Sequence, residues 1–160
     1  MNTYVILCVD DEREVLDSVM HDLEPLGSHF IIEGAESAPE AREVIAELEA
    51  EGRVLALILC DHVMPEVKGV DFLIELNENP HTKVTRKVLL TGQAGLESTI
   101  EAVNRGGLDY YIAKPWDATK LLETVVDQLT TFVIANEEDL IAYSGILDSE
   151  RLFEAIHQSG

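Results

Sequence analysis

The chain has 160 residues, 46% of them hydrophobic, which is enough for one domain with a substantial core. Its 31 acidic side chains against 11 basic ones give a formal net charge of -20, which would repel nucleic-acid backbones and anionic lipid surfaces. No apolar run approaches the roughly 20 residues of a membrane span, and the first residues lack the pattern of a signal peptide. We therefore expect a cytoplasmic protein that binds neither nucleic acid nor membranes directly.

Short apolar runs alternate with helical patterns along the chain. Strands are expected at 4–9, 30–32, 55–60, 87–90 and 110–113, and helices over about 11–25, 38–50, 70–77, 96–104 and from 118 onward. The run at 55–60 holds six apolar residues without alternation, which indicates a strand covered on both faces. The whole pattern predicts an α/β protein with a five-stranded parallel sheet, right-handed crossovers and helices on both faces.

The last expected helix carries two apolar stripes. One stripe can pack on the sheet, and the other has heptad-like spacing at Leu122, Val126, Leu129, Val133, Asn136 and Leu140. Two interpretations remain open: a homodimer formed through this helix, or one wide apolar face docked on the domain. Ser144-Gly145 is expected to break the helix, and a short final helix begins at Asp148 or Ser149. We therefore divide the chain into a domain at 1–130 and an extension at 131–160.

Polar side chains follow four of the five expected strands. Asp10 and Asp11 come after the first strand, Asp61 after the third, Thr91 after the fourth and Lys114 after the fifth. The carboxyl ends of parallel strands form one edge of a sheet, so these groups should converge there. Three carboxylates repel one another unless cations neutralise them, and Mg2+ prefers such oxygen ligands. A carboxylate nucleophile beside Mg2+, a lysine and a hydroxyl suits the acceptance of a phosphoryl group.

These residues resemble the signature of the response regulator receiver domain of two-component signalling. The resemblance covers about residues 4–130 and includes Met64, Pro65 and Gly69 after Asp61, and Tyr111 three residues before Lys114. It implies a flavodoxin-like fold with strand order 2-1-3-4-5. It also implies that the chain is a phosphoprotein of a phosphorelay, not an enzyme with its own substrate.

The resemblance also implies a role for each site residue. Asp61 would be the phosphoacceptor, and Asp11, Asp61 and the main-chain carbonyl of Val63 would bind Mg2+ directly. Asp10 would act on the metal through water, and Lys114 would contact the phosphoryl oxygens. All of these are expectations about an aspartyl phosphate site at the carboxyl edge of the sheet.

The same resemblance implies a switch and a set of partners. Thr91 and Tyr111 would be the switch pair, and the peptide bond between Lys114 and Pro115 would be cis. The altered surface would consist of the fourth helix, fifth strand and fifth helix. A sensor histidine kinase or phosphotransfer protein would supply the phosphoryl group. The output would lie in a downstream protein or in an effector domain absent from this sequence.

Each residue also has an ordinary structural interpretation when taken alone. Asp10 and Asp11 could cap a helix, Asp61 could form a turn and Lys114 could be a solvated charge. Their joint spacing favours the signalling function. The alternative function is a receiver-like scaffold that binds partners without ever being phosphorylated, although such a scaffold has no need for three mutually repelling carboxylates.

Overall fold

The computed structural model describes residues 3–92 and 95–159 and contains a five-stranded parallel sheet in the order β2-β1-β3-β4-β5. Both the α/β fold class and the strand order are therefore confirmed. The strands are β1 (Tyr4–Val9), β2 (Phe30–Ala35), β3 (Val54–Cys60), β4 (Arg86–Thr91) and β5 (Tyr110–Ala113). The helices are α1 (Arg13–Asp22), α2 (Ala38–Ala50), α3 (Gly69–Glu78), α4 (Leu96–Asn104), α5 (Ala118–Asn136) and α6 (Ser149–Ser159), with short 3-10 helices at Glu24–Ser28 and Ile141–Tyr143.

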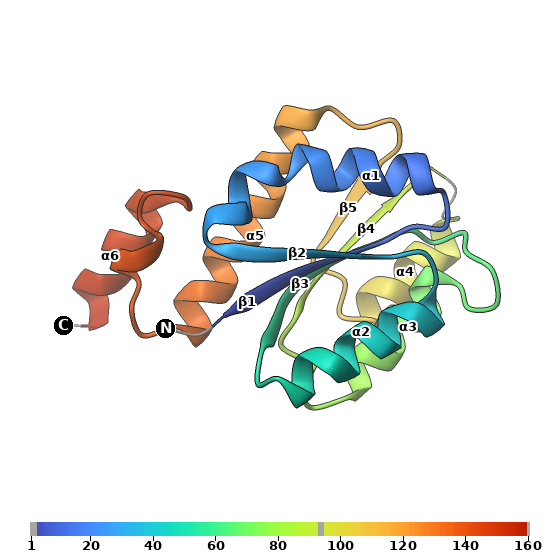
Figure 1. Ribbon diagram of the computed structural model, residues 1–160, viewed down its shortest axis with the longest axis horizontal. Coiled ribbons are helices and arrows are strands. Elements are labelled where there is room, and N and C mark those ends of the chain that lie inside the picture. Colours follow the sequence, from blue (N-terminus) through green and yellow to red (C-terminus); the bar gives the residue numbers. More distant parts are fainter. Residues whose placement is uncertain (1–2, 93–94, 160) are drawn as a thin grey trace.

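Helices cover both faces of the sheet, as the continuous apolar run of β3 predicts (Figure 1). The two faces have separate cores, and alternate residues of β1 point into each of them. Ile6 and Cys8 pack with α1 and α5, whereas Val5 and Leu7 pack with α2, α3 and α4. The carboxyl ends of β1 and β3 are thus held from both sides, and they position the residues that follow them.

The start of α2 shows how local sequence fixes the ends of these elements. The Ser37 hydroxyl accepts a hydrogen bond from the Glu40 backbone N–H at 3.2 Å, and the Glu40 carboxylate accepts one from the Glu36 N–H at 3.1 Å. This reciprocal pair satisfies N–H groups that would otherwise lack partners at a helix start, and Pro39 occupies the first turn. The turn from β2 into α2 is therefore specified by residues 36–40.

The end of α5 differs from the expectation. The helix was expected to continue to Ser144-Gly145, but it ends at Asn136, and the chain turns back through Ile141–Tyr143 into α6 (Figure 1). Tyr143 and Leu152 are fully buried in the core on the α1 and α5 side. Of the heptad-spaced stripe, Leu129, Val133 and Leu140 are buried, Leu122 and Val126 are half-buried, and Asn136 is exposed. Most of this stripe is thus covered within one copy of the chain.

A buried lysine at the start of β4 provides a pH-dependent test of the fold. The Lys87 ammonium donates hydrogen bonds to the main-chain oxygens of Thr82, Lys83 and Thr85 at 2.9 to 3.1 Å. Burial lowers the pKa of Lys87 to about 8, although the charge of Asp109 acts in the opposite direction. The folded chain therefore releases this proton at a lower pH than the unfolded chain does.

We expect this difference to make the free energy of unfolding rise between about pH 8 and the ordinary lysine pKa, because the unfolded state binds more protons there. Urea unfolding at several pH values would measure the rise, and the Lys87→Met variant should lack it. Equal pH slopes for both proteins would contradict the expectation. Lys83→Met is the matched control, because the exposed Lys83 enters these hydrogen bonds only through its main-chain oxygen.

Across residues 3–92 and 95–159, no helix combines the length and the apolar composition required to cross a lipid bilayer.

Candidate functional site

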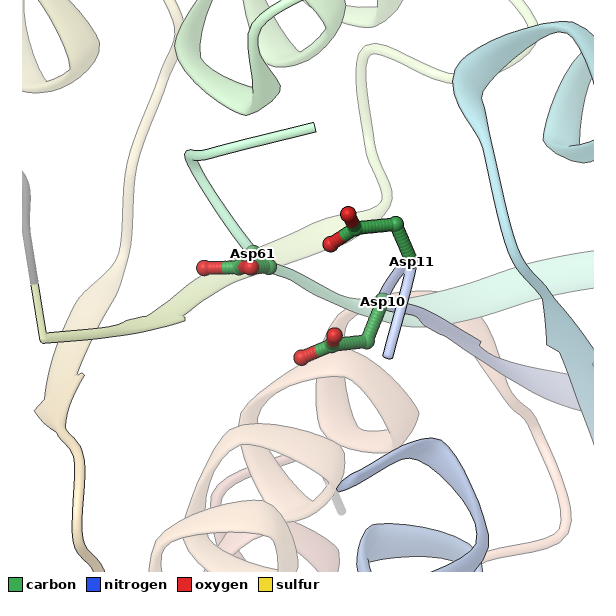
Figure 2. A group of neighbouring side chains, drawn as sticks. All are labelled: Asp10, Asp11 and Asp61. Atoms are coloured by element: carbon green, nitrogen blue, oxygen red, sulfur yellow. The ribbon is translucent and has the colours of Figure 1, made fainter. Parts of the chain in front are cut away.

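Three aspartates meet at the carboxyl edge of the sheet, where β1 and β3 end side by side. Figure 2 shows the carboxyl groups of Asp10, Asp11 and Asp61 grouped around one region. One carboxylate oxygen from each can be chosen so that all three lie within 4.8 Å of one another. Asp10 and Asp61 are each only 4% exposed, whereas Asp11 is exposed to solvent. The site thus has two fixed acids and one at its mouth.

Main-chain hydrogen bonds hold the two buried acids in place. The Asp10 N–H donates to the Ala35 carbonyl at 3.1 Å, and the Asp61 N–H donates to the Val9 carbonyl at 3.0 Å. Each side chain also accepts a bond from a nearby N–H: Asp10 Oδ1 from Glu12 at 2.9 Å, and Asp61 Oδ1 from His62 at 2.8 Å. In each carboxylate, Oδ1 therefore has a fixed main-chain partner, and Oδ2 remains available to contact other groups in the site.

Lys114 supplies the positive charge at the centre of the site. Its Nζ lies 2.7 Å from Asp10 Oδ2 and 3.5 Å from Asp61 Oδ2. Burial lowers the pKa of Lys114, but the hydrogen bonds and charges of Asp10 and Asp61 outweigh this effect and leave it raised. Burial raises the pKa of Asp10 and exceeds the opposing effect of Lys114. The lysine thus remains charged, while Asp10 takes up a proton more readily than an exposed aspartate.

Most of the predicted residues line one cleft; Asp10, which contacts Lys114, and Tyr111 do not. Asp11, Asp61, Val63, Thr91 and Lys114 line a cleft of about 260 Å³. Tyr111 is not among the lining residues. Its hydroxyl instead donates a 3.0 Å hydrogen bond to the Thr91 main-chain oxygen. Tyr111 is therefore joined to the site through the backbone of Thr91, and the predicted cis peptide bond between Lys114 and Pro115 is confirmed.

The loop after β3 contains two further supports that the sequence alone did not assign. Gly69 lies against the backbone of Asp61: an added Cβ would stand 1.9 Å from the Asp61 carbonyl oxygen. The Gly69 N–H donates to the His62 carbonyl at 2.9 Å, and the ring Nδ1 of the buried His62 accepts a 3.4 Å bond from the Val70 N–H. The start of α3 is thus fastened to the strand end that carries Asp61. Nothing in the sequence marks His62 for this role, whereas Gly69 is already part of the signature that follows Asp61.

The donor set fits a hard divalent cation. All three predicted ligand side chains are carboxylates, which Mg2+ prefers, and oxygens on opposite sides of such an ion lie about 4.2 Å apart. The chosen oxygens all lie within 4.8 Å of one another, which is close to this value. Asp11 is the solvent-exposed member of the set, so it is the ligand with room to adjust its side chain to an ion.

The fold and the site together define an open α/β protein with an acidic, lysine-bridged site at the carboxyl edge of its sheet. The model of the response regulator receiver domain matches residues 6–126. The chain therefore belongs to the receiver domain family of two-component response regulators.

Relatives and solved structures agree with this membership. The hydrogenase transcriptional regulatory protein HoxA of Cupriavidus necator is 33% identical over 120 residues, which cover 75% of this chain and 23% of HoxA. The response regulator receiver domain protein (CheY-like) from Methanospirillum hungatei is 30% identical with a TM-score of 0.69, and the match covers 82% of this chain and 97% of that one. The signal receiver domain of an HD domain-containing protein from Pseudomonas fluorescens is 25% identical with a TM-score of 0.74. That match covers 86% of this chain and 95% of the solved one. The chain spans about a quarter of the length of the hydrogenase regulators that it matches.

Proposed function

We propose that this receiver accepts a phosphoryl group on Asp61 from a histidine kinase or a phosphotransfer protein, with Mg2+ in the site. The observation that carries the proposal is the convergence of Asp10, Asp11 and Asp61, with the Lys114 ammonium in contact with Asp10 and Asp61. The buried Asp61 has one oxygen held by the His62 N–H, so its second oxygen faces the lysine and the cleft. That arrangement suits a carboxylate nucleophile that receives phosphate from outside.

The Mg2+ ligands in this proposal are Asp11, Asp61 and the main-chain oxygen of Val63, and Asp10 acts through a water molecule. When bound, the ion would neutralise charge on the phosphoryl group and help to align it. The lining of the cleft by Asp11, Asp61 and Val63 supports this assignment. Asp10 is the acid closest to Lys114, which fits a role one step removed from the metal.

In the transfer, an Asp61 carboxylate oxygen forms a bond to phosphorus while the bond from phosphorus to the donor histidine nitrogen breaks. The electron pair of that bond leaves with the imidazole, so no oxidant or further reactant is needed. The Lys114 Nζ lies 3.5 Å from Asp61 Oδ2. It can therefore contact the phosphoryl oxygens, which carry the new negative charge once the group is on Asp61. The product adds roughly -1.5 to -2 charges to the cleft.

The new charge would bias the chain between two states through Thr91 and Tyr111. Thr91 lines the cleft, and the Tyr111 hydroxyl contacts its main-chain oxygen, so a shift of Thr91 would alter the support of that ring. Ile100, Val103 and Tyr110 on α4 and β5 are each about half exposed and would form part of the output surface. A downstream protein or an effector domain would read that surface.

We further propose that residues 1–130 are the phosphoacceptor unit and 131–160 an extension, and that the chain works in the cytoplasm without an enzymatic substrate of its own. The match of the receiver model to residues 6–126 supports this division. The net charge of -20 argues against direct contact with nucleic acid or anionic membranes.

Intact-protein mass after incubation with Mg2+ and acetyl phosphate tests the proposal. We expect one added phosphoryl group on the wild-type chain and on Asp71→Asn, which alters an exposed aspartate on α3, but none on Asp61→Asn. Chelation of Mg2+ should abolish the addition. No addition to folded wild-type protein that binds Mg2+ would reject the proposal in favour of a scaffold that is not phosphorylated. A pull-down with unmodified chain would then be the relevant experiment.

A further inference from the structure

The connection between α5 and α6 bends where the sequence does not require it. α5 ends at Asn136, and Glu137 is extended with φ -113° and ψ 139°. The residues that follow, Glu137 to Leu140, include neither glycine nor proline, and the next glycine is Gly145. These four residues could continue a helix. The bend is therefore imposed by the packing of the segment after it and not by a helix-breaking residue.

The bend has few hydrogen bonds of its own. Glu137 Oε1 accepts from the backbone N–H groups of Glu138 and Asp139 at 3.0 and 3.3 Å, and Asp139 Oδ1 accepts from the Ala142 N–H at 3.4 Å. Three consecutive acids also stand at the carboxyl end of α5, where the helix dipole is negative. The bend thus depends on two side-chain caps in an unfavourable electrostatic position.

Two buried polar atoms near the bend lack hydrogen bonds. They are Glu137 Oε2 and the Tyr143 hydroxyl, and they are the only such side-chain atoms within residues 3–92 and 95–159. Buried polar groups are normally paired, so an unpaired atom disfavours the conformation that creates it. A straight continuation of α5 would release Glu137 to solvent.

The contact between α6 and α5, in contrast, contains several hydrogen bonds and a buried leucine side chain. Arg151 bonds Asp127 Oδ1 at 2.7 Å and Thr131 Oγ1 at 2.8 Å, and the Asp148 N–H donates to Thr130 Oγ1 at 3.2 Å. Leu152 is fully buried at this contact. All of these partners on α5 lie before the bend. The same contacts can therefore form whether α6 comes from the same chain or from a second copy.

We propose that two copies of this chain exchange residues 141–159. In the exchanged dimer α5 continues through 137–140, and the segment of each copy docks on α5 of the other copy. The α5–α6 contacts are retained between copies, and the cost of the bend is removed. The exchange lies away from the aspartates and is independent of phosphorylation.

The caps at the bend provide the first test. Light scattering during gel filtration of the full chain, over a range of concentrations, measures the dimer dissociation constant. Glu137→Ala/Asp139→Ala removes both caps and favours a continuous helix, so we expect this constant to fall at least about tenfold. Glu138→Ala is the matched control, because it removes one acid from the same stretch without removing a cap, and its constant should change clearly less. A double variant that remains monomeric at all concentrations would overturn the proposal.

A cysteine pair provides the second test, in a chain with its bend intact. Thr130→Cys/Asp148→Cys places thiols where the residue 148 N–H and the residue 130 side chain are in contact. After oxidation, the dimer fraction should contain disulfides between chains and the monomer fraction disulfides within a chain. A dimer whose disulfides are all within single chains would overturn the exchange, and so would the absence of any dimer at the highest concentration reached. Neither outcome would affect the phosphorylation of Asp61.

Discussion

Gly69→Ala is expected to lower the free energy of unfolding by about 3 kcal/mol and to impair the acidic site. The added methyl would stand 1.9 Å from the Asp61 carbonyl oxygen and 2.9 Å from the His62 Cα, and both are backbone atoms that cannot rotate away. Relief requires the start of α3 to move away from the end of β3, which breaks the Gly69–His62 hydrogen bond. Because Asp61 is part of the displaced backbone, Mg2+ affinity should fall with stability.

Urea unfolding followed by the fluorescence of Trp116, the one tryptophan, would measure the loss, and a Mg2+ titration would measure the effect on the site. Trp116 is suited to this because its indole N–H is fixed at 2.8 Å from Asp22 Oδ2 on α1. Gly27→Ala is the control: nothing lies within 4 Å of an added Cβ there. Equal stability of the two variants would show that the loop can accommodate a side chain at position 69.

Lys114→Met is expected to change two properties of the site in opposite directions. Phosphoryl incorporation from acetyl phosphate should slow by about 100-fold, because the charge that accompanies the transferring group is lost. Mg2+ should bind about tenfold more tightly, because the ammonium now 2.7 Å from Asp10 and 3.5 Å from Asp61 no longer repels the cation. A general loss of structure would weaken both properties together.

The rate of incorporation would be measured by intact mass at saturating Mg2+, and the affinity by calorimetry. Lys120→Met is the matched control, since Lys120 is exposed on α5 and does not line the acidic cleft. We expect it to leave both quantities unchanged. An incorporation rate in Lys114→Met equal to that of the wild-type chain would show that the lysine serves only to neutralise Asp10 in the resting site.

The site could be predicted from the sequence because each of its polar groups directly follows an apolar strand. Once the strands are parallel, Asp10, Asp61 and Lys114 must emerge at the same edge. The sequence could not indicate which carboxylate the lysine would contact most closely, because that depends on side-chain torsions. The same holds for Tyr111, whose hydroxyl meets the Thr91 main chain instead of lining the cleft.

The end of α5 could not be predicted for a different reason. Helical periodicity continues through Leu140, and the local sequence offers no stop signal before Ser144-Gly145. The observed end at Asn136 follows from long-range packing, since the ring of Tyr143 lies against those of Tyr4 and Phe30, far away in the chain. Local helical preference is weak compared with the burial of a large aromatic side chain.

Cys8 and Cys60 both lie within buried strands and are free thiols. Burial raises the pKa of Cys8 to about 12, and burial together with the charges of Asp61 and Asp10 raises the pKa of Cys60 even further. Only the thiolate reacts with alkylating reagents, so both should stay unmodified by maleimides in native protein near neutral pH. Fluorophores or spin labels can therefore be attached to single cysteines introduced on α4, α5 or α6 without first removing the native ones.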